Sequence, residues 1–343
     1  MLMLRSVLFI VFSAFLWSAQ LASAKSFFDY CMNPDSDAQR QTILAVMIKM
    51  KVQDRIDSRN CQHAADLLKE KWFLNIYPDP FEPARGPASD LSPIEDEIQL
   101  KILSVAKNEI TDIKPLAKLK DLTQLNVNYN PLSNITVLQN FRVLEEFFAT
   151  DTAVTDLQPL SSAKRLRVLS LAKNGIDNIL PLKDLNNLKA LYLSDNQIAD
   201  ASVIKGLALE YLHLGNNRIS ELDVTQSKES MILLDVAKNR LAAIDGLSQL
   251  AKIDALNIAD NEFAALGDLK ALKSLRWLDV RRNKISDISS LAELRDLEYL
   301  YLAGNSICRL PDDVAALQVE HQNSKGEWMR LEISGLDEQV GCL

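Results

Sequence analysis

The sequence predicts an α/β solenoid, in which short parallel strands form a curved, right-handed stack and line its concave face. The convex side is predicted to consist of 3₁₀ or extended turns, and each end to carry a disulfide-linked cap. Three observations predict this fold. A short leucine-containing pattern recurs ten times, its central leucines alternate with period two, and all four cysteines lie outside the repeated region.

The repeated pattern is Leu-x-x-Leu-x-Leu-x-x-Asn-x-Ile, with another apolar residue in place of Ile in some copies. Successive Asn positions are 22 residues apart, except for one interval of 21 residues between Asn196 and Asn217. Ten copies of five apolar positions and one polar position indicate a repeat architecture. The copies are Leu100 to Asn108, Leu122 to Asn130, Leu144 to Thr152, Leu166 to Asn174, Leu188 to Asn196, Leu209 to Asn217, Met231 to Asn239, Ile253 to Asn261, Leu275 to Asn283 and Leu297 to Asn305.

The need to bury the leucines predicts that the repeats stack on one another. The Leu-x-Leu pair places both leucines on one side of a strand, and a single repeat has too little chain to bury them alone. Twenty-two residues also leave too little chain for a long crossover helix. The Asn side chain should be buried where the chain leaves the strand, so it must hydrogen-bond to backbone groups. Thr152 replaces Asn once, which predicts a local irregularity there.

The pattern resembles that of the leucine-rich repeat family. The turn after the Asn, seen in Asp112-Ile113-Lys114-Pro115-Leu116 and Asp156-Leu157-Gln158-Pro159-Leu160, is similar to that of the bacterial internalin-like 22-residue subclass. The resemblance covers roughly residues 90 to 310. It implies a curved solenoid that binds a partner, and it names no particular partner.

Residues 1–24 resemble an export signal. Arg5 precedes an apolar stretch from Val7 to Trp17, and Ala22-Ser23-Ala24 offers a cleavage site. We expect the mature chain to begin near Lys25 and to be secreted or periplasmic. The alternative is an uncleaved N-terminal anchor. No later apolar run is long enough to predict stable membrane insertion.

Residues 25–71 are predicted to form a helical N-terminal cap, with one helix in Asp37 to Lys51 and another in Cys61 to Lys71. Residues 72–94 are predicted to form a degenerate first repeat with a proline-rich loop, in which Leu74 and Ile76 occupy the Leu-x-Leu positions. The ten visible repeats then span residues 95–307. Residues 308–343 are predicted to form the C-terminal cap, with a hairpin around Ser324-Lys325-Gly326 between Val319 and Ile333.

The cysteines lie where caps are expected. Because the two ends of an extended solenoid are far apart, Cys31 should pair with Cys61 and Cys308 with Cys342. The alternative is four free buried thiols. Each bridge would close a loop and add about 3 kcal/mol or more to stability.

Composition limits the function classes. The formal net charge is −8 and the chain has only ten glycines and three histidines. An acidic balance argues against a nucleic-acid partner, and few glycines argue against dinucleotide binding. We therefore expect a protein that binds no cofactor and has no enzymatic activity. We also expect it to be a monomer.

The residues on either side of the first leucine of each Leu-x-Leu pair should form two columns on the concave face. Large aromatic residues collect in the C-terminal half of these columns, which favours a protein-binding surface because Tyr, Trp and Arg dominate interface hot spots. The alternative is that aromatic residues simply suit strand surfaces. The predicted partner-binding residues are Phe148, Tyr192, Tyr211, His213, Asp235, Trp277, Asp279, Arg281, Tyr299 and Tyr301.

One group within these columns suggests other chemistry. His213, Asp235, Asn257 and Asp279 occupy consecutive repeats, so neighbouring side chains could share a cation or a proton. A flat, open strand surface lacks the pocket that an enzyme needs, so a cation site or an enzymatic site stays a remote alternative. The favoured function is an exported module that binds a protein with its concave face. The other surviving function is an envelope structural or assembly factor that binds a partner of its own cell.

Overall fold

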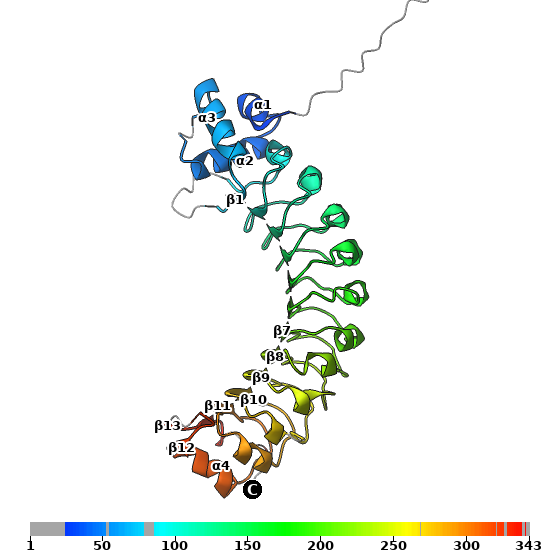
Figure 1. The fold of residues 1–343 in the computed structure, drawn as a ribbon, viewed down its shortest axis with the longest axis vertical. Coiled ribbons are helices and arrows are strands. Elements are labelled where there is room, and N and C mark those ends of the chain that lie inside the picture. The colour runs from blue at the N-terminus through cyan, green and yellow to red at the C-terminus, as the bar shows by residue number, and fades with distance from the viewer. Residues whose placement is uncertain are drawn as a thin grey trace, which may run out of the picture.

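A computed structural model describes residues 25–52, 55–78, 86–267, 269–319, 321–325, 328–337 and 340. The predicted signal peptide, residues 1–24, lies outside these residues. The chain forms an arc, with strands along its inner side and short helical turns along its outer side (Figure 1). The predicted solenoid with a parallel sheet and 3₁₀ turns is confirmed.

Three helices cover the N-terminal end of the arc, α1 (Phe27–Met32), α2 (Asp37–Lys49) and α3 (Ser58–Lys69). Polar side chains begin each of them. Ser26 and Asp29 form a reciprocal capping box at α1, while Ser36 and Asp57 cap the other two. The predicted bridge between Cys31 and Cys61 joins α1 to α3, with 5.7 Å between Cα atoms. Helices α2 and α3 match the two predicted helices, and α1 was not predicted.

Within the described residues, twelve parallel strands form one open sheet in chain order, except that β14 follows β11 directly. Leu74 in β1 pairs with Leu103 in β2, which confirms that residues around Leu74 form a first strand ahead of the ten repeats. The strands are β1 (Phe73–Asn75), β2 (Ile102–Ser104), β3 (Gln124–Asn126), β4 (Glu146–Phe148), β5 (Val168–Ser170), β6 (Ala190–Tyr192), β7 (Tyr211–His213), β8 (Leu233–Asp235), β9 (Ala255–Asn257), β10 (Trp277–Asp279), β11 (Tyr299–Tyr301) and β14 (Glu332–Ser334).

Leucines from every repeat form one continuous core behind the sheet, because each repeat supplies side chains at equivalent heights. The convex turns close the core from the other side. In several of them an Asp or Asn accepts a hydrogen bond from the backbone two residues later, as Asp112 does from Lys114 at 2.8 Å. Pro115 then occupies the first turn of the 3₁₀ helix, where no backbone donor is needed. The 3₁₀ turns after the repeats' strands are Lys114–Lys118, Thr136–Asn140, Gln158–Ser162, Leu180–Leu182, Ser202–Gly206, Thr225–Ser227, Leu247–Gln249, Leu269–Ala271 and Ser289–Glu293.

The repeated Asn side chains connect neighbouring repeats, as the sequence predicts. Asn130 donates from Nδ2 to the carbonyl oxygens of Val105 and Val127, both at 2.9 Å. Its Oδ1 accepts from the Ile110 amide at 2.9 Å. The irregularity predicted at Thr152 is confirmed, since its hydroxyl donates to Asn174 Oδ1 at 2.5 Å instead of bonding the preceding repeat.

One repeat is a residue shorter than the others, and a buried serine in the next turn bonds to the backbone at the shortened position. Leu207 and Leu209 are one residue closer than the corresponding pair in other repeats. Ser227 is fully buried beneath them, where its hydroxyl donates to the Leu207 carbonyl at 3.0 Å and accepts from the Leu209 amide at 3.0 Å. This buried serine is therefore satisfied and has a packing role.

The C-terminal end differs in part from the prediction. The predicted hairpin is present as β12 (His321–Gln322) and β13 (Trp328–Met329), which are antiparallel and follow α4 (Asp312–Ala315). Ile333 does not belong to this hairpin. It lies in β14, which pairs parallel to β11 and continues the ladder by one strand, because its side chain matches the position of Leu300. Cys308 is disulfide-bonded, and Cys342, its predicted partner, lies outside the described residues.

Candidate functional site

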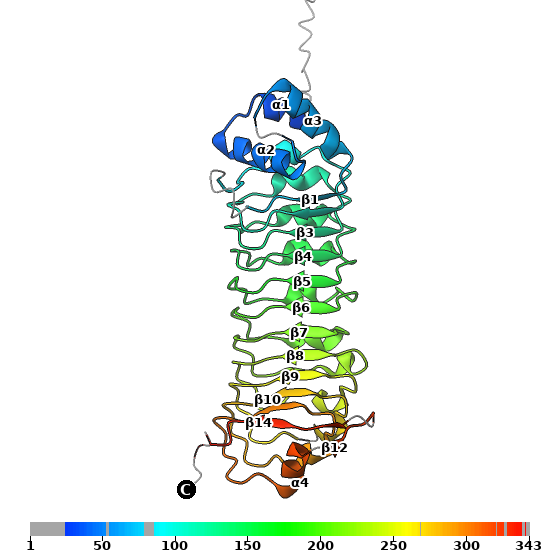
Figure 2. The same ribbon diagram turned by 90° about the vertical axis from the view of Figure 1, so that its left-hand side faces the viewer.

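The concave face is a surface to which every repeat contributes one strand. The strands stack across it from β1 to β14, and Figure 2 shows this face toward the viewer. On most strands the middle residue is buried and both neighbours are partly exposed. The two predicted columns of presented side chains therefore exist on this surface.

The C-terminal part of the face carries a connected aromatic group. The rings of Trp277 and Tyr301 have centroids 5.5 Å apart, and the Arg281 guanidinium lies 5.2 Å from the Tyr301 centroid. Tyr299, beside Trp277 in the strand register, is 40% exposed. Four of the predicted residues thus meet on neighbouring strands.

The structure contradicts the prediction that Asp279 contacts a partner. The Asp279 side chain is only 1% exposed. The Arg281 guanidinium covers it, with Nε 2.9 Å from Asp279 Oδ1. This hydrogen bond raises the pKa of Arg281 and fixes the direction of its side chain. Asp279 therefore positions Arg281 and is not itself a contact residue.

The centre of the face combines an imidazole, a carboxylate and a tyrosine. His213 Nδ1 lies 3.6 Å from Asp235 Oδ2, and its ring centroid is 4.9 Å from that of Tyr192. Burial raises the pKa of the Tyr192 hydroxyl, with Tyr211 adding to the effect. A hollow of about 240 Å³ opens next to this group and reaches Trp277.

The four polar residues in consecutive repeats do not assemble into one site. Asp279 is bonded to Arg281, and Asn257 Oδ1 accepts from the Ala259 amide at 3.2 Å. In the described part of the chain, no group of three or more His, Cys, Asp and Glu side chains is placed to hold a metal ion. The cation hypothesis therefore rests on His213 and Asp235 alone.

Phe148 lies apart from the other predicted residues. It pairs in register with Ser170, and Ser170 pairs with Tyr192, so a full strand separates the two aromatic side chains. The structure thus divides the predicted set into three parts: Phe148 on β4, a group on β6 to β8, and a group at β10 and β11. Ala255 and Asn257 of β9 separate the last two groups.

A second aromatic group at the N-terminal end of the face was missed. Trp72 and Phe73 are 62% and 45% exposed, with ring centroids 6.3 Å apart. Beyond the other end of β1, Lys107 Nζ lies 5.4 Å from the Tyr77 centroid and 5.5 Å from the Tyr129 centroid. A hydrogen bond with Tyr77 raises the pKa of Lys107. In the sequence, this aromatic group could have been recognised from the pair Trp72-Phe73, which directly precedes Leu74 in the degenerate repeat.

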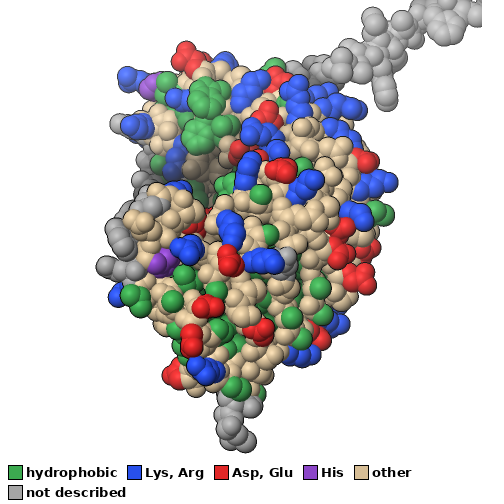
Figure 3. Space-filling view, turned by 60° about the horizontal axis from the view of Figure 1, so that its bottom comes forward, with side chains coloured by type: hydrophobic (Ala, Val, Ile, Leu, Met, Phe, Trp, Pro, Cys, Tyr) green, Lys and Arg blue, Asp and Glu red, His purple; other side chains and the backbone are tan. Residues whose placement is uncertain are grey.

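Charge is distributed in small opposite pairs. Lys and Arg side chains are mixed with Asp and Glu side chains over the view toward the C-terminal end (Figure 3). Arg282, which follows β10, pairs with Asp260, and Arg276 Nε, just before β10, lies 2.7 Å from Glu298. Among the described residues, no helix is long and apolar enough to cross a membrane.

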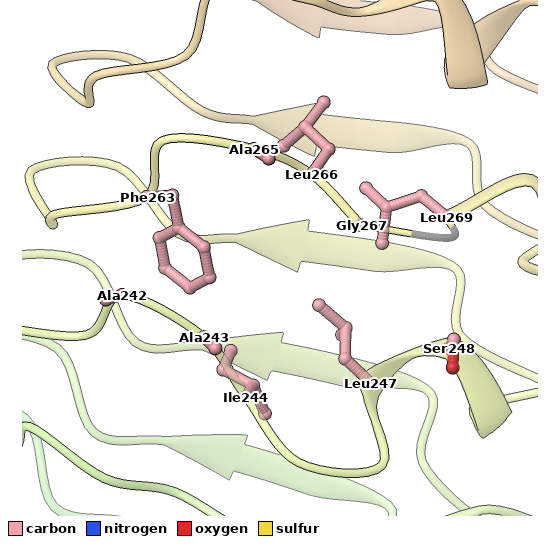
Figure 4. A pocket seen from close by; sticks show the side chains of 10 residues that line it. All are labelled: Ala242, Ala243, Ile244, Leu247, Ser248, Phe263, Ala265, Leu266, Gly267 and Leu269. Carbon is pink, nitrogen blue, oxygen red and sulfur yellow. The ribbon is translucent and has the colours of Figure 1, made fainter.

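A further apolar hollow of about 200 Å³ lies between two successive turns on the outer part of the arc. Phe263 and Leu266 from one turn and Ile244 and Leu247 from the preceding turn surround it (Figure 4). Small residues at Ala242, Ala243 and Ala265 leave this space unfilled, so it is a packing gap of two short turns.

Comparisons with known proteins agree with this geometry. A family model described as leucine-rich repeats in two copies matches residues 98–140, 164–206 and 273–315. The structure is similar to an internalin, InlF, from Listeria monocytogenes, with 25% identity, a TM-score of 0.65, and 83% of this chain and 86% of that chain covered. No curated protein sequence matches the chain significantly.

Two more distant structures share the fold. A leucine-rich repeat protein of Leptospira interrogans is 22% identical, with a TM-score of 0.64, over 80% of this chain and 74% of that chain. The plant peptide hormone receptor RGFR1, solved in complex with RGF2, is 17% identical, with a TM-score of 0.60, over 71% of this chain and 41% of that chain. The chain thus contains leucine-rich repeats in three matched segments, and the solved structures that it resembles include an internalin and another bacterial leucine-rich repeat protein.

Proposed function

We propose that this protein is an exported, non-enzymatic binding module that recognises a folded partner protein with its concave face. The observation that carries the proposal is a pair of aromatic groups on the concave strands, Tyr192 and Tyr211 on β6 and β7 and Trp277, Tyr299 and Tyr301 on β10 and β11. Partly exposed tyrosine, tryptophan and arginine side chains are the residues that contribute most to protein interfaces. Leucine-rich repeat folds are typical of protein-binding modules.

The disulfide between Cys31 and Cys61 supports export, because such bridges form and persist in oxidising compartments. An internalin among the structural neighbours supports the same compartment. The predicted signal peptide would supply the route. An envelope assembly factor, loaded with a partner of its own cell, is the second function that fits these observations.

The test compares partner binding by wild type and a double variant, Trp277→Ala with Tyr299→Ala. Loss of two aromatic anchors should weaken binding by several kcal/mol, about 4 kcal/mol or roughly a thousandfold in Kd. The melting temperature should change little, because Tyr299 is 40% exposed and both side chains lie outside the leucine core.

A matched control is Leu180→Ala on the convex turn. Leu180 is 57% exposed, so its loss should affect neither stability nor binding. Capture from the envelope fraction of the source cell, against capture from foreign cell surfaces, separates the two functions. Equal affinity of the double variant and wild type for the captured partner would reject the concave face as the binding surface.

A further inference from the structure

The hollow at the centre of the concave face has an apolar floor and one acidic side. Leu233, Ala255 and Trp277 are aligned on β8, β9 and β10, so the small Ala255 leaves a gap between two large neighbours. His213, Asp235 and Asn257 line its other side. Neighbouring strands are about 4.8 Å apart, so the gap spans roughly 10 Å.

Its volume of about 240 Å³ is small for a ligand site. Pockets for whole small molecules typically measure about 300–1,000 Å³. An opening of this size on an interaction surface fits one protruding side chain of a partner.

The charge around the hollow is unequally compensated. Arg281 is paired with Asp279, Arg282 with Asp260, and Arg276 with Glu298. These basic side chains are therefore already neutralised by acids of this chain. Asp235 differs, because within the described residues its ion-pair partner is His213, at 3.6 Å, and no Lys or Arg. Asp235 is thus a carboxylate at the edge of the hollow that is available to a cation of a partner.

We propose that this hollow receives one arginine or lysine side chain of the partner, an inference that rests on the proposed function. The alkyl stem would lie over Leu233 and Ala255, and the cationic end would reach the Asp235 carboxylate. Trp277, which lines the hollow, adds an aromatic surface that attracts a cation. Such amphipathic side chains bury their stems while their charged ends keep a polar partner.

A purely apolar side chain fits the hollow less well. It would cover the Asp235 carboxylate and remove its water without replacing the lost hydrogen bonds, which is unfavourable. An acidic side chain would be repelled by the same charge. A cationic end instead forms a charge-assisted hydrogen bond, which is stronger than a neutral one.

The test uses the full mature chain and two small probes, Nα-acetyl-arginine amide and Nα-acetyl-norleucine amide. Norleucine has a similar alkyl stem and no charge. Binding is followed by NMR on the indole N–H of Trp277, assigned with Trp277→Phe. The arginine probe should give a saturable shift and bind at least about tenfold more tightly than the norleucine probe.

Two substitutions separate charge from shape. Asp235→Asn should weaken binding of the arginine probe to the level of norleucine, whereas the control Asp151→Asn, an exposed acid elsewhere in the repeats, should not. Ala255→Leu should fill the hollow and abolish binding of both probes, whereas Ser104→Leu on β2 should leave it unchanged. Asn can still accept the Ala237 amide hydrogen bond that Asp235 accepts at 3.1 Å, so Asp235→Asn should fold normally.

The inference is overturned by equal binding of the two probes, by an Asp235→Asn variant that binds the arginine probe as wild type does, or by the absence of any saturable shift. These outcomes are distinct from failure of the proposed function. A partner that still binds Asp235→Asn normally, but is lost from the Trp277→Ala and Tyr299→Ala double variant, leaves the concave interface standing and removes the cationic contact.

Discussion

Replacing Asn130 with alanine tests how the repeats are held together. Asn130 is 3% exposed and forms hydrogen bonds to both its own repeat and the preceding one. In the Asn130→Ala variant the buried Ile110 amide loses Asn130 Oδ1 as its acceptor. The Val127 carbonyl loses Asn130 Nδ2 as its donor. The Val105 carbonyl keeps a bond from Asn108 at 3.0 Å.

The expected cost follows from the two groups left without a partner. A buried backbone group that loses its hydrogen bond costs about 1–3 kcal/mol, so the variant, with two such groups, should lose roughly 2–6 kcal/mol of unfolding free energy. Urea unfolding measures the total. Amide hydrogen exchange should show the largest loss of protection at Ile110 and the adjoining repeats, because each repeat contacts only its neighbours.

Asn187→Ala is the matched control. Asn187 is exposed, and its Nδ2 donates to the Lys164 carbonyl at 2.7 Å on the surface, where water can replace it. This variant should lose less than about 1 kcal/mol. The reasoning is refuted if Asn130→Ala costs no more than Asn187→Ala, or if exchange increases evenly along the arc.

Three further predictions concern other parts of the chain. Reducing the disulfide that joins α1 to α3 should lower the melting temperature and cost about 3 kcal/mol, as its closed loop implies; a melting curve indifferent to reductant contradicts this. Hydrogen bonds from Thr225 lower the pKa of Asp223 from 3.8 to about 2, so its stabilisation is complete above about pH 4 and lost as the pH falls toward 2. Between about pH 4 and pH 2, the free energy of unfolding of Asp223→Asn should therefore fall less than that of wild type. Parallel curves of unfolding free energy against pH for the two proteins would disprove the assignment. Gly335→Ala should open the last strand pair, because the added Cβ would lie 2.5 Å from the Ala303 nitrogen at a φ of +82°; unchanged amide protection in β11 would count against this.

Much of the fold follows from sequence because one physical pattern repeats. The spacing of the leucines places every strand from β2 to β11, and the same alternation identifies the strand around Leu74 despite its irregular loop. The strand around Ile333 could not be assigned in this way. Its apolar alternation is equally suited to a hairpin, and its parallel pairing with β11 depends on how the chain returns after α4.

The candidate site is predicted less completely. Alternation correctly places Trp277 and Tyr301 on the same surface, but it cannot show that Arg281 folds back over Asp279 and removes it from solvent. That contact is a matter of side-chain rotamer and charge. Trp72 and Phe73 were missed because the degenerate repeat was used only to locate buried positions.

Site-specific photo-crosslinking tests the concave interface most directly. A benzophenone amino acid replaces Tyr299 on the concave strand β11 in one variant and Leu180 on the convex turn in another, both at exposed positions. The concave variant should crosslink the captured partner and the convex variant should not. Crosslinking from Leu180 but not from Tyr299 would show that the partner binds the outer side of the arc and would contradict the proposed function.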